Sequence, residues 1–215
     1  MKDILTHRRL AAGYSRILCR PLGYADKQEI VYSSPFPVNG YTIALRPLNI
    51  LTDLTLAYEW LRLTYARNTW KTNGPVKQLE EVYTQMMQCD FAQPFMVLQD
   101  NKPVCVAEFH HARHHEVGLY YESQPGDYAV SLLLSPDKKK DKDLPACILQ
   151  ACLQYAFSFT EVDRVIAEFN IHNSPMNELV SRSGFRFMKK ADMLDRIANM
   201  YCISRIGFRQ MVNSQ

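Results

Sequence analysis

The sequence has little net charge and no long apolar segment. Its 25 lysines and arginines are nearly balanced by 22 acidic residues, so the formal net charge is only +3. So small an excess gives no reason to expect nucleic-acid binding. No apolar run approaches the roughly 20 residues that a membrane-spanning helix needs. We therefore expect a protein that binds neither nucleic acid nor membrane.

The sequence also lacks the cysteine and histidine patterns of disulfide-linked and metal-binding proteins. Its six cysteines form no Cys-x-x-Cys pair, and most lie in apolar segments, where cysteine is usually a small core residue. Four histidines gather between His110 and His115, but their spacing matches no common zinc pattern. The basic N-terminus is interrupted by Asp3 and no apolar region follows, unlike a signal peptide. We expect reduced thiols, no metal and a cytoplasmic location.

What the sequence does contain indicates one domain with a short extension. Its 215 residues are 47% hydrophobic and 11% aromatic, which is enough to bury a sizeable core. Residues 1–35 are interpreted as an N-terminal extension with a short amphipathic helix and the first strand of a hairpin. The turn of that hairpin is the segment Pro37–Gly40. Residues 36–215 are interpreted as a single domain.

Hydrophobic periodicity and turn residues place the remaining elements. We expect a helix capped by Thr52 or Asp53 that ends near Arg67, and a second helix whose first turn contains Pro75. Strands are then expected over residues 94–99 and 103–109, joined by a tight turn at Asp100-Asn101, and over residues 118–122 and 127–134. The remaining expected elements are a helix over 144–159, a strand over 163–169, a helix between Ser174 and Gly184, and strands over 185–190 and 196–204. This order predicts an α/β fold.

The chain is organised around the stretch from Asp127 to Asn173. A strand, a short loop, a helix and a second strand in this order form a βαβ unit with a parallel pairing. The loop before such a helix often binds an anion, because the helix N-terminal N–H groups favour phosphate. Here the loop contains no glycine, and its lysines are Lys138, Lys139, Lys140 and Lys142. These lysines either supply charge to phosphate groups or belong to an ordinary solvated loop.

Several short motifs recur in a fixed order along the chain. They are RPLN before the first helix, an aromatic strand with Glu108, then GLYYE, DYAVSLLL, RVIAEFNIHN and the GF of RSGFRF. Over residues 41–205 this ordered set resembles the GNAT superfamily of acyl-CoA-dependent N-acyltransferases. It is most similar to the branch that acylates hydroxylamines or amines in hydroxamate siderophore assembly. The resemblance implies the GNAT fold, a mixed, mostly antiparallel sheet with one parallel, splayed pair of strands and flanking helices.

The resemblance also implies a binding mode for acetyl-CoA or another acyl-CoA. In such enzymes the thioester lies across the splay, and a strand N–H polarises its carbonyl. Here that strand is 130–134, which makes Leu132, Leu133 and Leu134 cofactor-binding candidates. The pyrophosphate position and the end of the second strand add Lys140, Lys142, Asp143, Leu144 and Asn173. The acceptor nitrogen must arrive unprotonated, helped by a base or a relayed water.

Three positions depart from the family pattern. The family histidine falls on Ser131, and in the family E-P-D-x-x-N element Glu168 matches but Asn170 replaces the aspartate. Ser131, Asn170 and Glu168 are therefore the candidate catalytic residues, with His172 as a replacement base. The family R-G-x-G loop falls on residues 141–144, which contain no glycine. There Asp143 is expected to cap the helix and occupy amides that a phosphate would use.

Four side chains are candidates for binding the acceptor. Glu108 lies in mid-strand, where a carboxylate could bind a cationic substrate. Trp70 lies in the break between two helices, and Tyr121 and Asp127 could line an amine pocket. Three of them have a plainer alternative, namely a packing residue for Trp70, a sheet aromatic for Tyr121 and a turn residue for Asp127.

Two hypotheses of different classes follow. The first is an acyl-CoA-dependent N-acyltransferase for a small amine or hydroxylamine, acting in siderophore biosynthesis. A hydroxylamine is largely unprotonated near neutral pH, so proximity and the strand N–H can suffice without a strong base. The second is a GNAT-fold protein that has lost acyl-CoA catalysis and acts as a binding or partner subunit. A weaker third alternative is an acyltransferase for a peptide amine.

Overall fold

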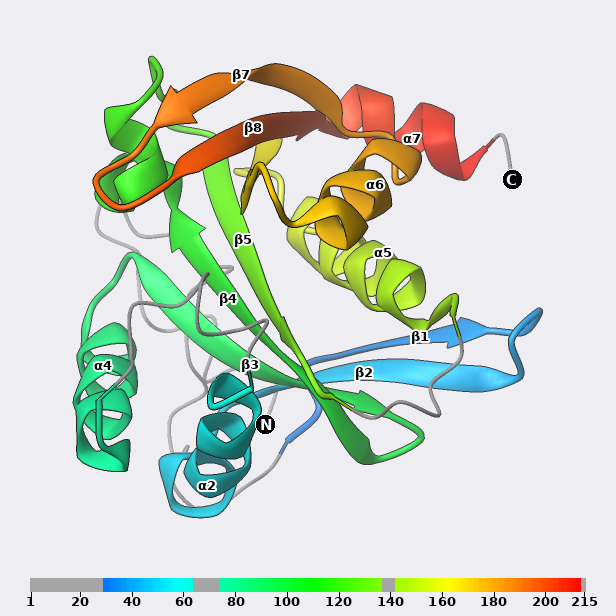
Figure 1. Cartoon of the computed structure of the whole chain (residues 1–215). Helices are drawn as coiled ribbons and strands as arrows, with labels where there is room; N and C mark the ends of the chain where they lie inside the picture. The colour runs from blue at the N-terminus through cyan, green and yellow to red at the C-terminus, as the bar shows by residue number, and fades with distance from the viewer. Residues whose placement is uncertain (1–28, 64–73, 137–141, 214–215) are drawn as a thin grey trace. The chain divides into compact units, whose positions relative to one another are not determined.

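The computed structural model describes residues 29–63, 74–136 and 142–213 (Figure 1). The chain divides into two compact units. The first combines Met1–Phe109 with Leu132–Lys140, and the second combines His110–Ser131 with Asp141–Gln215. The expected boundary between an extension at 1–35 and a domain at 36–215 stays a prediction, because the helix expected in the extension lies outside the described residues.

The first unit begins with the expected hairpin. Strands β1 (Tyr32–Phe36) and β2 (Tyr41–Pro47) pair in antiparallel fashion, and Gly40 between them takes a φ of +74°. Helices α2 (Ile50–Leu61) and α4 (Val76–Gln88) follow. Strands β3 (Ala92–Gln99) and β4 (Lys102–His111) come next, joined by Asp100 and Asn101. Both linking residues have positive φ, as the expected tight turn requires.

Helix α2 does not begin where the sequence predicted. Asn49 is its N-cap and accepts a hydrogen bond from a first-turn amide at 2.9 Å, so the prediction of Thr52 or Asp53 as cap was wrong. The Asp53 carboxylate instead accepts hydrogen bonds from both terminal nitrogens of Arg46, at 2.6 and 2.8 Å. Both side chains are only 5% exposed. Asp53 is therefore committed to a buried ion pair and is not the capping residue.

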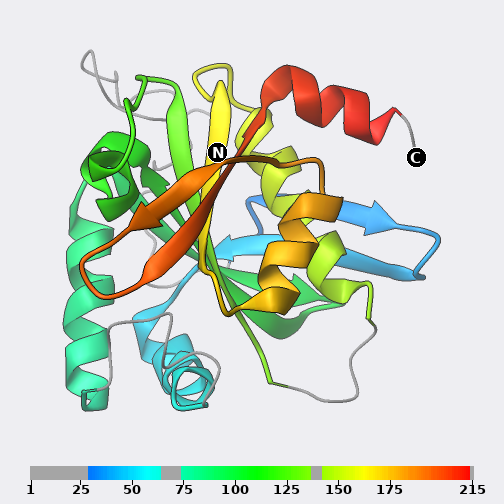
Figure 2. The ribbon, with the colours of Figure 1, turned by 45° about the horizontal axis from the view of Figure 1, so that its top comes forward.

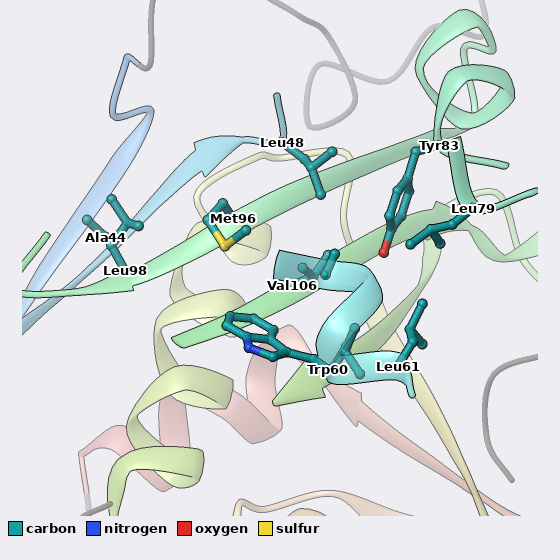
Figure 3. Packing of buried hydrophobic residues seen from close by; sticks show 11 residues of the cluster. Ala44, Leu48, Trp60, Leu61, Leu79, Tyr83, Met96, Leu98 and Val106 are labelled. Carbon is teal, nitrogen blue, oxygen red and sulfur yellow. The ribbon is translucent and has the colours of Figure 1, made fainter. Parts of the chain in front are cut away.

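One apolar cluster holds the first unit together (Figure 3). Its buried members come from both helices and from four strands, and they include Trp60, Leu61, Leu79, Met96 and Val106. Tyr83 extends from α4 with its hydroxyl directed into this cluster, and it is fully buried. Methionine and aromatic residues at helical spacing also predict core for one face of α4, where Leu79 and Tyr83 are indeed buried while Val76 is 40% exposed.

The second unit contains most of the βαβ segment. Strand β5 (Asp127–Leu134) contributes its first five residues, and helix α5 (Leu144–Phe157) and strand β6 (Arg164–Asn170) follow. Helix α6 (Ser174–Arg182), strands β7 (Arg186–Asp192) and β8 (Ile197–Ser204), and helix α7 (Arg205–Val212) complete the unit. Both views show α5 and α6 side by side (Figures 1 and 2). Helix α7 was not expected from the sequence.

The segment GLYYE, expected as a strand, forms none. In its place lie two short 3-10 helices, η2 (Ala112–His114) and η3 (Glu116–Leu119), followed by irregular chain. Gly118 explains the difference, because a Cβ there would lie 2.2 Å from the Ala112 carbonyl oxygen. The tight fold-back thus requires glycine at this position. Ala112 and Val117 from this segment are buried against strand residues such as Ile166, Ala198 and Met200.

The strands follow the order β1-β2-β3-β4-β5-β6-β8-β7. Strands β5 and β6 are parallel, whereas the pairs β1–β2, β2–β3, β6–β8 and β7–β8 are antiparallel. This confirms the predicted α/β fold with a mixed, mostly antiparallel sheet and one parallel pair. Among the described residues, no helix is long and apolar enough to cross a membrane.

Candidate active site

The parallel strands β5 and β6 pair along only part of their length. Within the described residues their pairing consists of Asp127–Arg164, Tyr128–Val165 and Ala129–Ile166. Strand β6 nevertheless continues to Asn170 and stays paired with β8 throughout. The edge of β6 beyond Ile166 therefore forms no ladder with β5. This interruption is the splay that the sequence predicted.

Asp127 closes the paired end of these strands. Its carboxylate accepts hydrogen bonds from Arg164 Nε and Nη2 at 2.7 and 2.6 Å, from the Tyr121 hydroxyl at 3.0 Å and from the Gln124 amide at 2.8 Å. Burial, and then the Asp127 charge, raise the pKa of the Tyr121 hydroxyl. Both oxygens of Asp127 are occupied and the residue is fully buried. This geometry favours a structural role for Asp127 and Tyr121 over an amine pocket, although Asp127 begins β5 and is not a turn residue, and Tyr121 lies in irregular chain and not in a strand.

The three candidate catalytic residues lie on one face of the second unit's strands. Ala129 and Ile166 form the last β5–β6 pair, and both belong to the apolar cluster of this unit. Because side chains alternate along a strand, Ser131 and Glu168, each two residues further on, share that face. Asn170 follows Glu168 by another two residues. Ser131 and Glu168 are thus the first side chains of this face beyond the last pair.

Glu168 is held by an arginine that the sequence did not single out. Its Oε1 atom lies 2.6 Å from Arg196 Nη2, and the Arg196 side chain is 6% exposed. The same nitrogen lies 3.8 Å from Glu116 Oε2, and Arg196 Nη1 lies 2.5 Å from Asp195 Oδ1. Burial alone would lower the pKa of Arg196, but Glu168 and Asp195 raise it above its usual value. Arg196 is therefore a permanent cation among three carboxylates.

Asn170 and Asn173 shape the turn between β6 and α6. Asn170 Oδ1 accepts a hydrogen bond from the His172 amide at 2.9 Å, and Asn173 caps α6 by accepting one from the Met176 amide at 3.4 Å. Asn177 Nδ2 donates to the carbonyl oxygens of both asparagines, at 2.9 and 2.8 Å. His172 itself is exposed. Asn173, and not Ser174, is thus the cap of this helix.

The start of α5 differs from the expected capped loop. Asp143 occupies the N-cap position with helical backbone angles, φ −87° and ψ −15°, and within the described residues its side chain makes no capping hydrogen bond. Capping residues normally have extended backbone angles, so the prediction that Asp143 occupies the first amides was wrong. Lys142 and Asp143 are exposed, whereas Leu144 is 1% exposed and belongs to the core. Lys140 lies outside the described residues.

Two features near the residues expected to hold acyl-CoA suit such a ligand. The β6 edge left without a β5 partner is of the kind that an extended, amide-bearing ligand can pair with. The first turn of α5 has no side-chain cap among the described residues. Leu132 and Leu134 are half-buried, and Leu133 is buried in the first unit's apolar cluster. Any contribution of Leu133 to the ligand would therefore come from its backbone.

Glu108 and Tyr83 form a buried pair of titratable groups in the first unit. Glu108 follows Val106 by two residues on β4, so its side chain shares the face on which the Tyr83 hydroxyl is directed (Figure 3). Burial raises the pKa of Glu108 to about 8, and Tyr83 limits that rise. Burial and the Glu108 charge raise the pKa of Tyr83. Trp70, another candidate for binding the acceptor, lies outside the described residues.

The histidines of the second unit are close together without forming a metal centre. The rings of His110 and His115 are 4.4 Å apart, and those of His111 and His114 are 5.5 Å apart. In the part of the chain that the structure describes, no group of three or more His, Cys, Asp or Glu residues could hold a metal ion. Burial lowers the pKa of His110 to about 4.

Sequence reasoning missed Arg196 and the pairing of Tyr83 with Glu108. Arg196 stands 28 positions from Glu168 and belongs to no motif. Tyr83 was recognised only as a core residue, because its helical spacing shows which face is buried and not what that face contacts. The only available signal was Glu108 itself, a charged residue inside an otherwise apolar strand.

Comparisons with known proteins agree with this fold. Residues 49–193 match the family model "Acetyltransferase (GNAT) domain". The chain is 28% identical over 126 residues to an N-hydroxyputrescine acetyltransferase of Acinetobacter baumannii, a match that spans 58% of this chain and 60% of that relative's length.

Solved structures resemble it at lower identity. An uncharacterized protein from Bacillus halodurans has a TM-score of 0.80 and 18% identity, with 88% of this chain and 97% of that chain covered. The aminoglycoside acetyltransferase AAC(6')-Ib, in complex with coenzyme A, has a TM-score of 0.71 and 19% identity, with 78% and 98% covered. Because the family model matches well over half of the chain, the protein belongs to the GNAT acetyltransferase domain family.

Proposed function

We propose that this protein transfers an acyl group from an acyl-CoA to the nitrogen of a small amine or hydroxylamine, as a step in hydroxamate siderophore biosynthesis. The observation that carries the proposal is the interrupted pairing of β5 and β6, with Ser131 and Glu168 the first side chains beyond it. Family membership supports acyl transfer. The match to an N-hydroxyputrescine acetyltransferase supports a hydroxylated diamine as acceptor.

The chain's own residues would contribute mainly by position and polarity. A bound acyl-CoA supplies the thioester whose carbon the acceptor nitrogen attacks. An N–C bond forms, the C–S bond breaks, and the nitrogen loses a proton while CoA leaves as its thiol. The β5 backbone near Ser131 would polarise the thioester carbonyl. Glu168 would accept a hydrogen bond from the acceptor nitrogen and orient its lone pair. Asn170 would act through the turn that it stabilises, and Lys142 would lie near the phosphates.

The test measures transfer directly. Purified protein is given acetyl-CoA with N-hydroxyputrescine, N6-hydroxylysine or putrescine, and the released CoA thiol is followed over time. We expect the hydroxylamines to react faster than putrescine at pH 7, because their nitrogen is largely unprotonated. If no acceptor increases thiol release above the rate without acceptor, the proposed function is wrong.

A second candidate function is favoured by the start of α5. There the exposed Lys142 and the buried Leu144 stand where the family loop has its glycines, and the Asp143 carboxylate lies between them. A GNAT fold with this loop could have lost acyl-CoA catalysis and act as a binding subunit. Calorimetric titration with acetyl-CoA and longer acyl-CoAs separates the two candidates, because absence of binding at millimolar ligand would leave only the second. Replacing Lys138, Lys139, Lys140 and Lys142 together should weaken binding more than tenfold if they hold phosphates.

A further inference from the structure

Arg196 binds Glu168 differently from the way Arg164 and Arg46 bind their aspartates. Arg164 reaches both oxygens of its aspartate through two nitrogens, at 2.7 and 2.6 Å, and Arg46 does the same at 2.6 and 2.8 Å. Paired forks of this kind are the usual geometry of an arginine–carboxylate contact. Arg196, by contrast, contacts one oxygen of Glu168 through one nitrogen, Nη2, at 2.6 Å. The Arg196–Glu168 contact therefore does not have the geometry expected of a group whose only role is ion pairing.

The second oxygen of Glu168 stays unengaged. Oε2 is buried from solvent, and no described residue donates a hydrogen bond to it. Leaving a buried carboxylate oxygen without a donor costs free energy, and a second guanidinium contact would remove that cost. Arg196 Nη1 instead contacts Asp195 at 2.5 Å, Nη2 also lies 3.8 Å from Glu116, and no described residue accepts a hydrogen bond from the buried Nε. The surrounding carboxylates thus keep Arg196 on Oε1.

The unengaged oxygen lies where the proposed reaction needs an acceptor of hydrogen bonds. Glu168 is the first residue of its face beyond the Ala129–Ile166 pair, and Ser131 holds the equivalent position on β5. An amine or hydroxylamine nitrogen that attacks a thioester here carries N–H groups, and these are donors. A carboxylate with one oxygen fixed and the other unengaged can bind such a nitrogen in one orientation.

We propose that Arg196 is a positioning residue, which holds Glu168 by Oε1 so that Oε2 accepts a hydrogen bond from the nitrogen of the acceptor. The inference rests on the proposed N-acyltransferase function and adds to it a group that fixes acceptor binding. Glu168 contacts the acceptor nitrogen directly, and Arg196 affects acceptor binding only by positioning Glu168. Glu116 and Asp195 keep the guanidinium in place.

A double-mutant cycle tests this dependence. Arg196→Met, Glu168→Gln and the combined variant are assayed with acetyl-CoA and N-hydroxyputrescine, and kcat and KM are measured for each substrate. We expect Arg196→Met to lower kcat/KM for the acceptor at least tenfold while the KM for acetyl-CoA changes less than twofold. The combined variant should be no worse than Glu168→Gln, because Arg196 has nothing left to position. Arg196→Lys should recover part of the loss.

A matched control and two further readings make the outcome decisive. Arg182 forms an exposed ion pair with Glu178, with side chains 79% and 60% exposed, so Arg182→Gln should leave both KM values unchanged. If the losses of Arg196→Met and Glu168→Gln multiply in the combined variant, or if the loss follows acetyl-CoA and the acceptor equally, Arg196 is a structural residue and the inference is wrong. If the wild type transfers to no acceptor, the proposed function fails instead.

Discussion

Replacing Glu108 by glutamine should change how the stability of this protein depends on pH. Glu108 is 6% exposed, and burial raises its pKa to about 8 from an ordinary value of 4.5. The folded protein therefore keeps a proton on Glu108 over a pH range in which the unfolded chain has lost it. Stability that is fully present below pH 4.5 declines as pH rises, and the decline ends near pH 8.

The size of the decline follows from the two pKa values. Each unit of difference corresponds to about 1.4 kcal/mol. From 4.5 to about 8, the decline amounts to at most about 5 kcal/mol in the free energy of unfolding. Glutamine at this position has nearly the same shape and no charge, so it abolishes this contribution. The free energy of unfolding of the variant should therefore increase relative to that of the wild type as pH rises from 5 to 8.

Urea unfolding at half-unit intervals from pH 4.5 to 8.5, followed by tryptophan fluorescence, measures the difference. We expect the two unfolding free energies to be similar near pH 4.5 and to diverge steadily up to about pH 8. Two parallel curves would refute the reasoning, because they would mean that Glu108 is ionised at the same pH in the folded and unfolded chain. That result would restore Glu108 as a carboxylate suited to a cationic acceptor at neutral pH.

Three other substitutions test further parts of the structure by the same unfolding assay. The His110 pKa is lowered from 6.5 to about 4, so the free energy of unfolding of the wild type falls by at most about 3 kcal/mol as pH drops through that range. His110→Gln should remove this decrease. Arg46→Met should lower the free energy of unfolding by about 3–5 kcal/mol, because Asp53 would stay buried without its cation. A decrease below about 1 kcal/mol would contradict the buried pair. Asp127→Asn should lower the free energy of unfolding by about 1–3 kcal/mol. This decrease is smaller than for Arg46→Met, because the Arg164 side chain is 32% exposed. Equal decreases for the two variants would contradict that difference in burial.

Local signals in the sequence were sufficient for most element boundaries. The strand over 127–134 was predicted with its observed ends, because a loop with proline and charged residues follows a continuous apolar run. Asn39-Gly40 and Asp100-Asn101 identified two tight turns, since each contains a residue that tolerates positive φ. Periodicity was less informative at helix ends, where α2 ends at Leu61 and not near Arg67.

The candidate site was less accessible to sequence reasoning, because its contacts join distant positions. Arg164 meets Asp127 across 37 residues, and Arg196 meets Glu168 across 28. Alternation could not orient Glu108, because every residue from Val104 to Phe109 is buried and the strand has no solvent face. Only the folded chain shows that Glu108 lies on the face of Tyr83.

The point at which β5 and β6 part follows from how each strand is held. β6 is paired with β8 along its whole length, from Arg164–Ser204 to Asn170–Ala198, so its course is fixed from that side. β5 is joined to it only at the start, where the forked contact of Asp127 with Arg164 lies within the first pair. One end is therefore closed by a charged contact, whereas among the described residues the β5–β6 ladder ends at its third pair. Because that closed end sets the register of both strands, it also sets the relative position of Ser131 and Glu168. Asp127→Asn should accordingly lower kcat even under conditions in which the variant is fully folded.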